Sequence, residues 1–134
     1  MTAELTYLML TAILASGLWI PYIVGTVMQP GDASSDFTRP PDLTTLPAWV
    51  HRAYRAHLNL LEQLLPFAVV VLVGHTLGVS TTITIIAATI FFWLRIIHAI
   101  GMISGLAIFP IRPMIFMAGW ATILVIAWQV FANA

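Results

Sequence analysis

Hydrophobic residues are gathered into four long runs along the chain, and polar residues fill the segments between them. A helix rises about 1.5 Å per residue, so about 20 apolar residues are needed to cross the hydrocarbon core of a bilayer. Each run meets that length. We therefore predict an all-α integral membrane protein, a single domain built as a four-transmembrane-helix bundle, with spans at about residues 5–28, 48–78, 83–106 and 112–131.

The second run carries polar side chains that a lipid-facing helix would avoid. Four of them share a helix face about 80° wide: Arg52, Arg55, Asn59 and Glu62. A charged side chain near the bilayer centre costs about 2.5–3.5 kcal/mol on insertion scales, so this stripe must face headgroups, a partner helix or a polar ligand. Pro66 adds a further polar group, because a proline frees the carbonyl four residues earlier, which is that of Glu62.

Composition agrees with a membrane protein and narrows the possible chemistry. Hydrophobic residues make up 60% of the chain and charged residues only 7%, against about 25% charged in a soluble domain. There is no basic cluster, so nucleic-acid binding is not expected. There is no cysteine, which excludes disulfides and a cysteine nucleophile. No metal is expected either, because metal-site spacing is lacking among the histidines, which are His51, His57, His75 and His98.

The positions of the arginines predict how the chain is oriented. Four of the five lie near the segments that join the first run to the second and the third to the fourth: Arg39, Arg52, Arg55 and Arg112. Both termini and the turn at 78–82 lack Lys and Arg. By the positive-inside rule, the arginine side faces the cytoplasm and both termini lie on the opposite side.

Spacing alone leaves two interpretations of this arginine-rich region. Arginine binds carboxylates through two parallel hydrogen bonds, so Arg52, Arg55 and Arg112 with Asn59 and Glu62 would suit a small zwitterionic ligand. Alternatively, the first two arginines reach lipid phosphates, and the carboxylate pairs with an arginine of the third run as a purely structural contact.

Arg112 and two residues of the third run are further candidates. A cation lowers the pKa of a nearby thiol from its usual value of about 8.5, so Arg112 could hold a substrate thiol as a thiolate. Alternatively, Arg112 could contribute only to the orientation of the chain in the membrane. His98, three residues after Arg95, is either a ligand contact or the donor of an interhelical hydrogen bond.

Three short blocks follow one another along the second, third and fourth runs: residues 55–62 are RAHLNLLE, residues 95–98 are RIIH and residues 110–112 are PIR. They resemble the R-A-x-x-N-x-x-E, R-x-x-H and P-I-R patterns of the MAPEG superfamily, the membrane-associated proteins in eicosanoid and glutathione metabolism. The preceding segment, residues 40–54, is similar to the eicosanoid branch. The resemblance covers roughly residues 40–116 and indicates a bacterial-type member.

This resemblance implies a homotrimer that binds glutathione as a co-substrate between neighbouring subunits, next to the membrane lipids that deliver a lipophilic second substrate. It implies an enzyme that conjugates glutathione to lipophilic electrophiles or reduces lipid hydroperoxides. Arg112 would be the catalytic residue and would stabilise the thiolate. The glutathione-binding residues would be Arg52, Arg55, Asn59, Glu62, Gln63, Arg95 and His98.

The chain departs from this family pattern at several positions. Glutathione-binding members carry tyrosines where this chain has Gln63, Met102 and Phe116, and each lost hydroxyl removes a hydrogen bond worth about 0.5–1.5 kcal/mol. Pro113 stands where the prostaglandin-synthase branch has a serine. These departures motivate an alternative function: a non-catalytic membrane protein of the same fold that binds lipid headgroups or another anionic metabolite.

Overall fold

The structure is a computed structural model that describes residues 1–28, 42–106 and 108–134. Within these ranges all regular elements are helices: α1 (Ala3–Leu18), α2 (Ile20–Val27), α3 (Ala48–Thr76), α4 (Thr82–Ser104) and α5 (Ile111–Asn133). In the same ranges four stretches are long and apolar enough to cross a membrane: Ala3–Val27, Ala48–Thr76, Thr82–Ser104 and Ile111–Asn133. The predicted all-α, four-helix membrane architecture is therefore confirmed. Arg39 lies outside the described residues.

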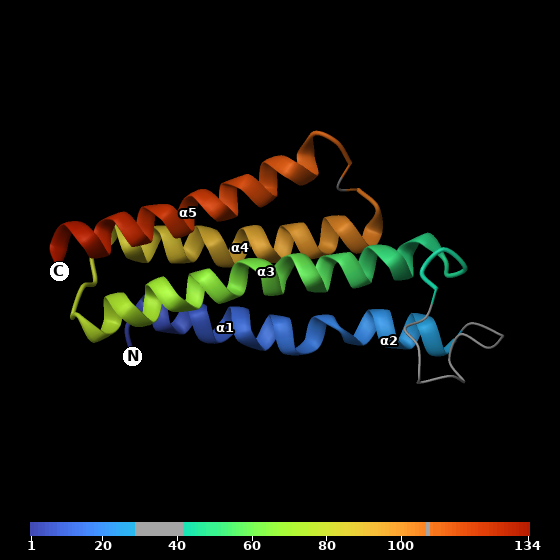
Figure 1. Cartoon of the computed structure of the whole chain (residues 1–134), viewed down its shortest axis with the longest axis horizontal. Coiled ribbons are helices and arrows are strands. Elements are labelled where there is room, and N and C mark those ends of the chain that lie inside the picture. The colour runs from blue at the N-terminus through green and yellow to red at the C-terminus, as the bar shows by residue number, and fades with distance from the viewer. Residues whose placement is uncertain (29–41, 107) are drawn as a thin grey trace.

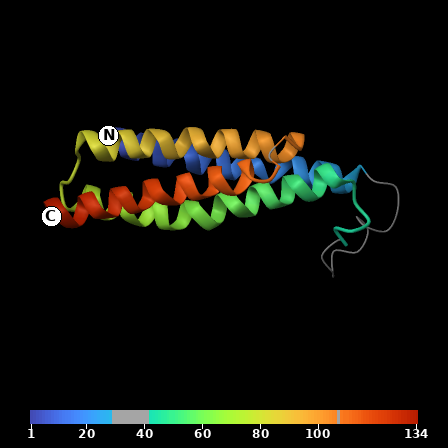
Figure 2. The same ribbon diagram turned by 90° about the horizontal axis from the view of Figure 1, so that it is seen from above.

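The helices run lengthwise in one elongated bundle, in which α4 packs against α1, α3 and α5 (Figures 1 and 2). Both termini lie at one end (Figure 1). We call this the glutamate end, because Glu4 lies there beside the start of α4. The opposite end is where α2 and α4 finish and α3 and α5 begin (Figure 1). We call it the arginine end, because Arg52, Arg55 and Arg112 belong to the first turns of α3 and α5.

The first membrane stretch is interrupted at Trp19, between α1 and α2. Pro21 has no backbone N–H and cannot donate to the carbonyl of Gly17, four residues earlier. That carbonyl instead accepts a hydrogen bond from the N–H of Trp19. The proline thus changes which N–H donates to the carbonyl of Gly17, and this carbonyl is not left unpaired.

Helix α3 is longer than the membrane requires. Its 29 residues correspond to about 44 Å, whereas the hydrocarbon core is about 30 Å thick. Pro66 lies inside α3, and the helix continues through it. The excess length allows the first turns, with Arg52 and Arg55, to reach the level of the headgroups while the later turns stay in lipid.

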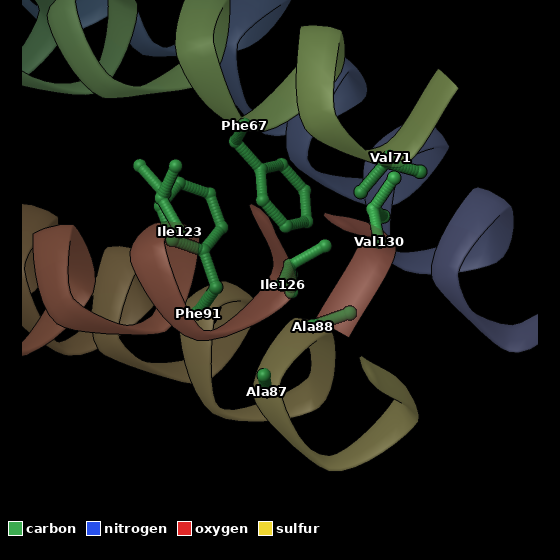
Figure 3. Close-up of a cluster of buried hydrophobic side chains, with 8 residues drawn as sticks. All are labelled: Phe67, Val71, Ala87, Ala88, Phe91, Ile123, Ile126 and Val130. Carbon is green, nitrogen blue, oxygen red and sulfur yellow. The ribbon is translucent and has the colours of Figure 1, made fainter. Parts of the chain in front are cut away.

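The main apolar core joins α3, α4 and α5 between the two ends (Figure 3). The rings of Phe67 and Phe91 stack at its centre, with 4.0 Å between their centroids. Ala87 and Ala88 present little side-chain volume on α4, so α5 can approach closely. Lipid tails are as apolar as these side chains, so within this cluster the helices are held together by close packing.

Candidate functional site

A cavity of about 680 Å³ lies at the arginine end, between α3, α4 and α5. In Figure 1 the first turns of α5 diverge from α4 next to this region. Five side chains predicted from the sequence line the cavity: Arg55, Asn59, Glu62, His98 and Arg112. Residues far apart in the sequence are therefore brought to one place.

The α3 residues meet there because of their spacing. Arg55, Asn59 and Glu62 are separated by four and then three positions, which places them on one side of a helix. Their depths differ: Asn59 is only 5% exposed, while Arg55 is half-buried and Glu62 is exposed. The cavity thus has an amide in its interior and charged groups toward its rim.

Helix α4 contributes a buried imidazole to the same cavity. His98 is 2% exposed, and its Nε2 atom has no hydrogen-bond partner among the described residues. Its ring lies 6.5 Å from that of Phe116, measured between centroids. A buried polar atom without a partner is costly, so this nitrogen is available to a ligand that enters the cavity.

Two other predicted residues, Arg95 and Gln63, lie behind the cavity and anchor α5. The Nη2 atom of Arg95 donates to the carbonyl of Ile115 at 3.1 Å. The Nε2 atom of Gln63 donates to the carbonyl of Phe116 at 2.9 Å. Both side chains are at most 3% exposed. They hold the start of α5 against α3 and α4, so they position the wall of the cavity instead of lining it.

One interpretation of the sequence paired the guanidinium group of Arg95 with the carboxylate of Glu62. The contacts of the Arg95 side chain bear on this pairing. Its guanidinium group points to the backbone of α5, and its Nε and Nη1 atoms have no partner among the described residues. It packs against the rings of Phe91 and Phe116, at 5.5 and 5.9 Å from their centroids. Glu62 is exposed and lines the cavity instead.

The close fit around Arg95 depends on Gly119 of α5. A Cβ atom at this position would collide with the Arg95 guanidinium group and would lie 2.6 Å from Oε1 of Gln63. That oxygen has no hydrogen-bond partner among the described residues. The absence of a side chain at Gly119 therefore makes room for two long polar side chains.

Arg52 does not line the cavity, although it belongs to the predicted stripe. Its Nη2 atom donates to the carbonyl of Ile103 at 3.4 Å, in the last turn of α4. The guanidinium group lies beside Gly105, whose φ of +85° ends that helix in the left-handed region. A cation at a helix C-terminus is favourable, so Arg52 secures the end of α4.

The model of the MAPEG family matches residues 5–132, nearly the whole chain. The chain belongs to the MAPEG family. It is thus an integral, multi-pass membrane protein of the superfamily concerned with glutathione and eicosanoid metabolism. The family membership that the three motifs indicated is confirmed. No curated protein and no solved structure matches the chain.

The three positions at which this MAPEG chain lacks a tyrosine have different surroundings. Phe116 lines the cavity, so a ring without a hydroxyl stands on its wall. Met102 is packed in an apolar cluster with Ala56 and Leu60. Gln63 bonds to the backbone of α5. Of the three positions without a tyrosine, only Phe116 lines the cavity, so it is the one at which the missing hydroxyl makes the cavity wall less polar.

An apolar wall completes the cavity on the α5 side. Its members, which were not predicted from the sequence, are Ile108, Phe109, Pro113 and Met117. These four residues lie on either side of the P-I-R motif at residues 110–112, so the motif could have indicated that its neighbours line the cavity. An apolar residue in a membrane helix has the same pattern whether it contacts lipid or ligand, so periodicity could not identify them.

Proposed function

We propose that this MAPEG protein binds glutathione in the arginine-end cavity and uses its sulfur to attack a lipophilic electrophile or a lipid hydroperoxide. The observation that carries this proposal is the set of polar groups around one cavity: two guanidinium groups, one carboxylate, one amide and one imidazole. Glutathione carries two carboxylates and one ammonium group. The charges of Arg55, Arg112 and Glu62 are complementary to these groups.

The thiol is activated by Arg112 in this proposal. Its guanidinium group stays charged in any protein environment and favours the thiolate over the neutral thiol. In conjugation, the sulfur–carbon bond forms as the leaving group departs with its bonding electrons, and the thiol proton passes to solvent. In peroxide reduction, the sulfur attacks one oxygen and the O–O bond breaks, which gives an alcohol and a sulfenic acid. A second glutathione then yields the disulfide and water.

The second substrate would contact the apolar wall of the same cavity. Ile108, Phe109 and Met117 offer a surface for an acyl or aromatic group next to the charged rim. All three side chains are more than half exposed on the single chain. A lipophilic substrate could therefore enter from the surrounding lipid without crossing the polar side of the cavity.

We further propose that the protein is a homotrimer whose arginine end faces the cytoplasm. The exposure of Glu62 on a membrane-spanning helix supports the assembly, because a neighbouring subunit would shield this carboxylate from lipid. The positive-inside rule supports the orientation. The mass of the detergent-solubilised protein, measured by light scattering, tests the assembly; a monomeric mass would contradict it.

A turnover assay tests the proposed chemistry. Purified protein in detergent is given glutathione with a hydrophobic aryl halide, and separately with a hydrophobic hydroperoxide. Loss of one preorganised donor typically lowers turnover by about 10²–10³-fold, which we expect for Arg112→Ala. Arg112→Lys keeps the charge and should retain part of the activity. The control is Met114→Ala, an exposed residue in the same first turns of α5. Equal rates for wild type and Arg112→Ala would contradict the thiolate role.

The second candidate function is non-catalytic binding of an anionic lipid headgroup or metabolite in the same cavity. It is favoured by Phe116, which offers no hydroxyl to glutathione. Thermal unfolding separates the two candidates. Glutathione at 100 times its dissociation constant should stabilise a binding protein by about 2.7 kcal/mol. Stabilisation by an anionic phospholipid, but not by glutathione, would favour the second candidate.

A further inference from the structure

A second cavity, of about 220 Å³, lies at the glutamate end of the bundle, remote from the cavity proposed to bind glutathione. Residues from α1, α3, α4 and α5 enclose it. Aliphatic side chains form one part of its lining: Val70, Val71, Val79, Ile126 and Val130. Polar residues form another part, and among them Glu4 supplies the one carboxylate of the described lining.

Glu4 is held firmly on one side only. It is 5% exposed, and its Oε1 atom accepts hydrogen bonds from the hydroxyls of Thr84 at 2.6 Å and Ser80 at 2.9 Å. Both donors belong to the start of α4 or the turn just before it. The other oxygen, Oε2, is buried and has no partner among the described residues. The carboxylate is thus oriented by two hydroxyls while one of its oxygens has no donor.

The hydroxyls of Ser80 and Thr84 donate to Oε1 only, so the contact that the carboxylate still lacks is a hydrogen-bond donor to Oε2. A carboxylate accepts about four hydrogen bonds, and a buried carboxylate without a donor is strongly unfavourable. None of the described residues that line the cavity is Arg or Lys. A cationic ligand would therefore supply a donor to Oε2 and also balance the charge of the carboxylate. His75, which also lines the cavity, is exposed.

The walls distinguish between kinds of cation. Ca²⁺ requires about six to eight oxygen ligands and Mg²⁺ nearly ideal octahedral geometry. The described lining offers one carboxylate and a few hydroxyls, two of which already donate to that carboxylate, so it does not match either metal ion. A primary alkylammonium group has three N–H donors and an apolar tail. Such a group matches one oxygen of Glu4 together with aliphatic walls such as those of Val70 and Ile126.

We propose that the glutamate-end cavity binds a primary alkylammonium group, with its ammonium on Oε2 of Glu4 and its chain against Val70, Ile126 and Val130. This site is separate from the cavity at the arginine end and does not depend on its function. The same ammonium chemistry occurs in free alkylamines and in the ethanolamine headgroup of a phospholipid. The experiment therefore includes both sources.

Thermal unfolding of the full chain in detergent tests the proposal, with n-butylammonium chloride as the probe. n-Butanol controls for the alkyl chain, and sodium chloride at equal ionic strength controls for the charge. We expect a saturable rise in Tm with butylammonium and no saturable rise with either control. Glu4→Gln keeps an oxygen for Ser80 and Thr84 but replaces Oε2 with an NH2 group, which donates hydrogen bonds and cannot accept one from an ammonium group. It should weaken butylammonium binding at least tenfold. The matched control Asp42→Asn removes an exposed carboxylate and should bind like wild type.

Three results would overturn the proposal: butanol shifts Tm as much as butylammonium, sodium chloride does so, or Glu4→Gln binds butylammonium like wild type. If Glu4→Gln does not fold, Val70→Phe provides the test, because it reduces the space for the chain without removing the carboxylate. This variant should lose its response to butylammonium and keep its response to methylammonium. Equal loss or equal retention of both responses would overturn the proposal.

A second measurement asks whether the ammonium group comes from a phospholipid. It uses native mass spectrometry after reconstitution with equal amounts of phosphatidylethanolamine and phosphatidylcholine. Preferential retention of the ethanolamine lipid by wild type, lost in Glu4→Gln, would identify the headgroup as a source of the ammonium. Equal retention of both lipids, together with a butylammonium shift that depends on Glu4, would identify a free amine as the ligand.

Discussion

At the glutamate end, one buried carboxylate accepts two hydroxyl hydrogen bonds, one from the start of α4 and one from the turn before it. At the arginine end, Arg55, Glu62 and Arg112 border a cavity about three times larger, in which Glu62 is exposed. The first arrangement uses a charge to join helices. The second leaves charges accessible at the rim. The comparison teaches that burial alone does not assign a role to a polar group in a membrane bundle. Glu4 joins two segments and still has one oxygen without a partner among the described residues, whereas Glu62 is accessible at a rim.

The largest effect on stability is expected from Glu4→Ala. Hydrogen bonds to charged groups contribute about 1.5–3 kcal/mol each, and this change removes the acceptor of two. The loss should be about 3 kcal/mol, because the Thr84 hydroxyl can still donate to the carbonyl of Thr81 at 2.9 Å. Unfolding in mixed micelles measures it. The control is Ser16→Ala, whose exposed hydroxyl bonds only within α1. Equal stability of both variants would remove the proposed difference between the two ends.

Arg55→Ala should affect binding and leave stability nearly unchanged. Arg55 is half-buried at the rim, and a charged hydrogen bond to a glutathione carboxylate would contribute about 1.5–3 kcal/mol. The KM for glutathione should rise roughly 10- to 100-fold with kcat little changed, since this contact is made equally in the ground and transition states. His51→Ala, an exposed position one turn earlier, is the control. A lower kcat at unchanged KM would assign Arg55 to the chemical step.

Gly119→Ala tests how tightly Arg95 and Gln63 are held behind the cavity, where they donate hydrogen bonds to α5. The added methyl group would collide with the guanidinium group of Arg95 and approach Oε1 of Gln63. Overpacking of this kind costs about 1–3 kcal/mol, which denaturant or thermal unfolding would measure. The adjacent Ala118 is exposed, so Ala118→Val should have little effect. If the two variants were equally stable, Arg95 and Gln63 would not be tightly held.

The smallest effect is expected from Phe116→Tyr, which adds a hydroxyl to the cavity wall. One neutral hydrogen bond contributes about 0.5–1.5 kcal/mol, so glutathione should bind roughly 2- to 12-fold more tightly. Isothermal titration measures the change. Met102→Tyr serves as a contrast, because Met102 is packed in an apolar cluster where an added ring and hydroxyl should destabilise the fold. Unchanged affinity in Phe116→Tyr would mean that the hydroxyl does not reach the bound peptide.

The membrane architecture could be predicted because lipid imposes a simple rule on sequence. Long apolar runs must form helices that satisfy their own backbone, and the apolar runs here do so. The grouping of Arg55, Asn59 and Glu62 was also predictable, since helical spacing fixes which side chains share a face. The order of the four runs and the positive-inside rule placed Arg112 at the same end of the bundle, but contact with one cavity depends on how the helices pack.

Other residues could not be assigned from spacing. Arg52 shares a face with Arg55, yet its side chain reaches the end of α4 because Gly105 leaves room for it there. Arg95 and Gln63, predicted from the resemblance to contact glutathione, donate hydrogen bonds to carbonyls of α5, which no local pattern indicated. Glu4 was visible only as an acidic residue before an apolar run. Its hydroxyl partners lie 76 and 80 positions away, beyond the reach of any local pattern.

The hydrogen bonds that fasten the start of α5 end on main-chain oxygens, those of Ile115 and Phe116. Every amino acid supplies that oxygen, so these two hydrogen bonds do not depend on which side chain occupies either position. A substitution at position 116 therefore leaves the acceptor for Gln63 in place. The side chain that faces the cavity can change while the backbone of α5 keeps these two hydrogen bonds.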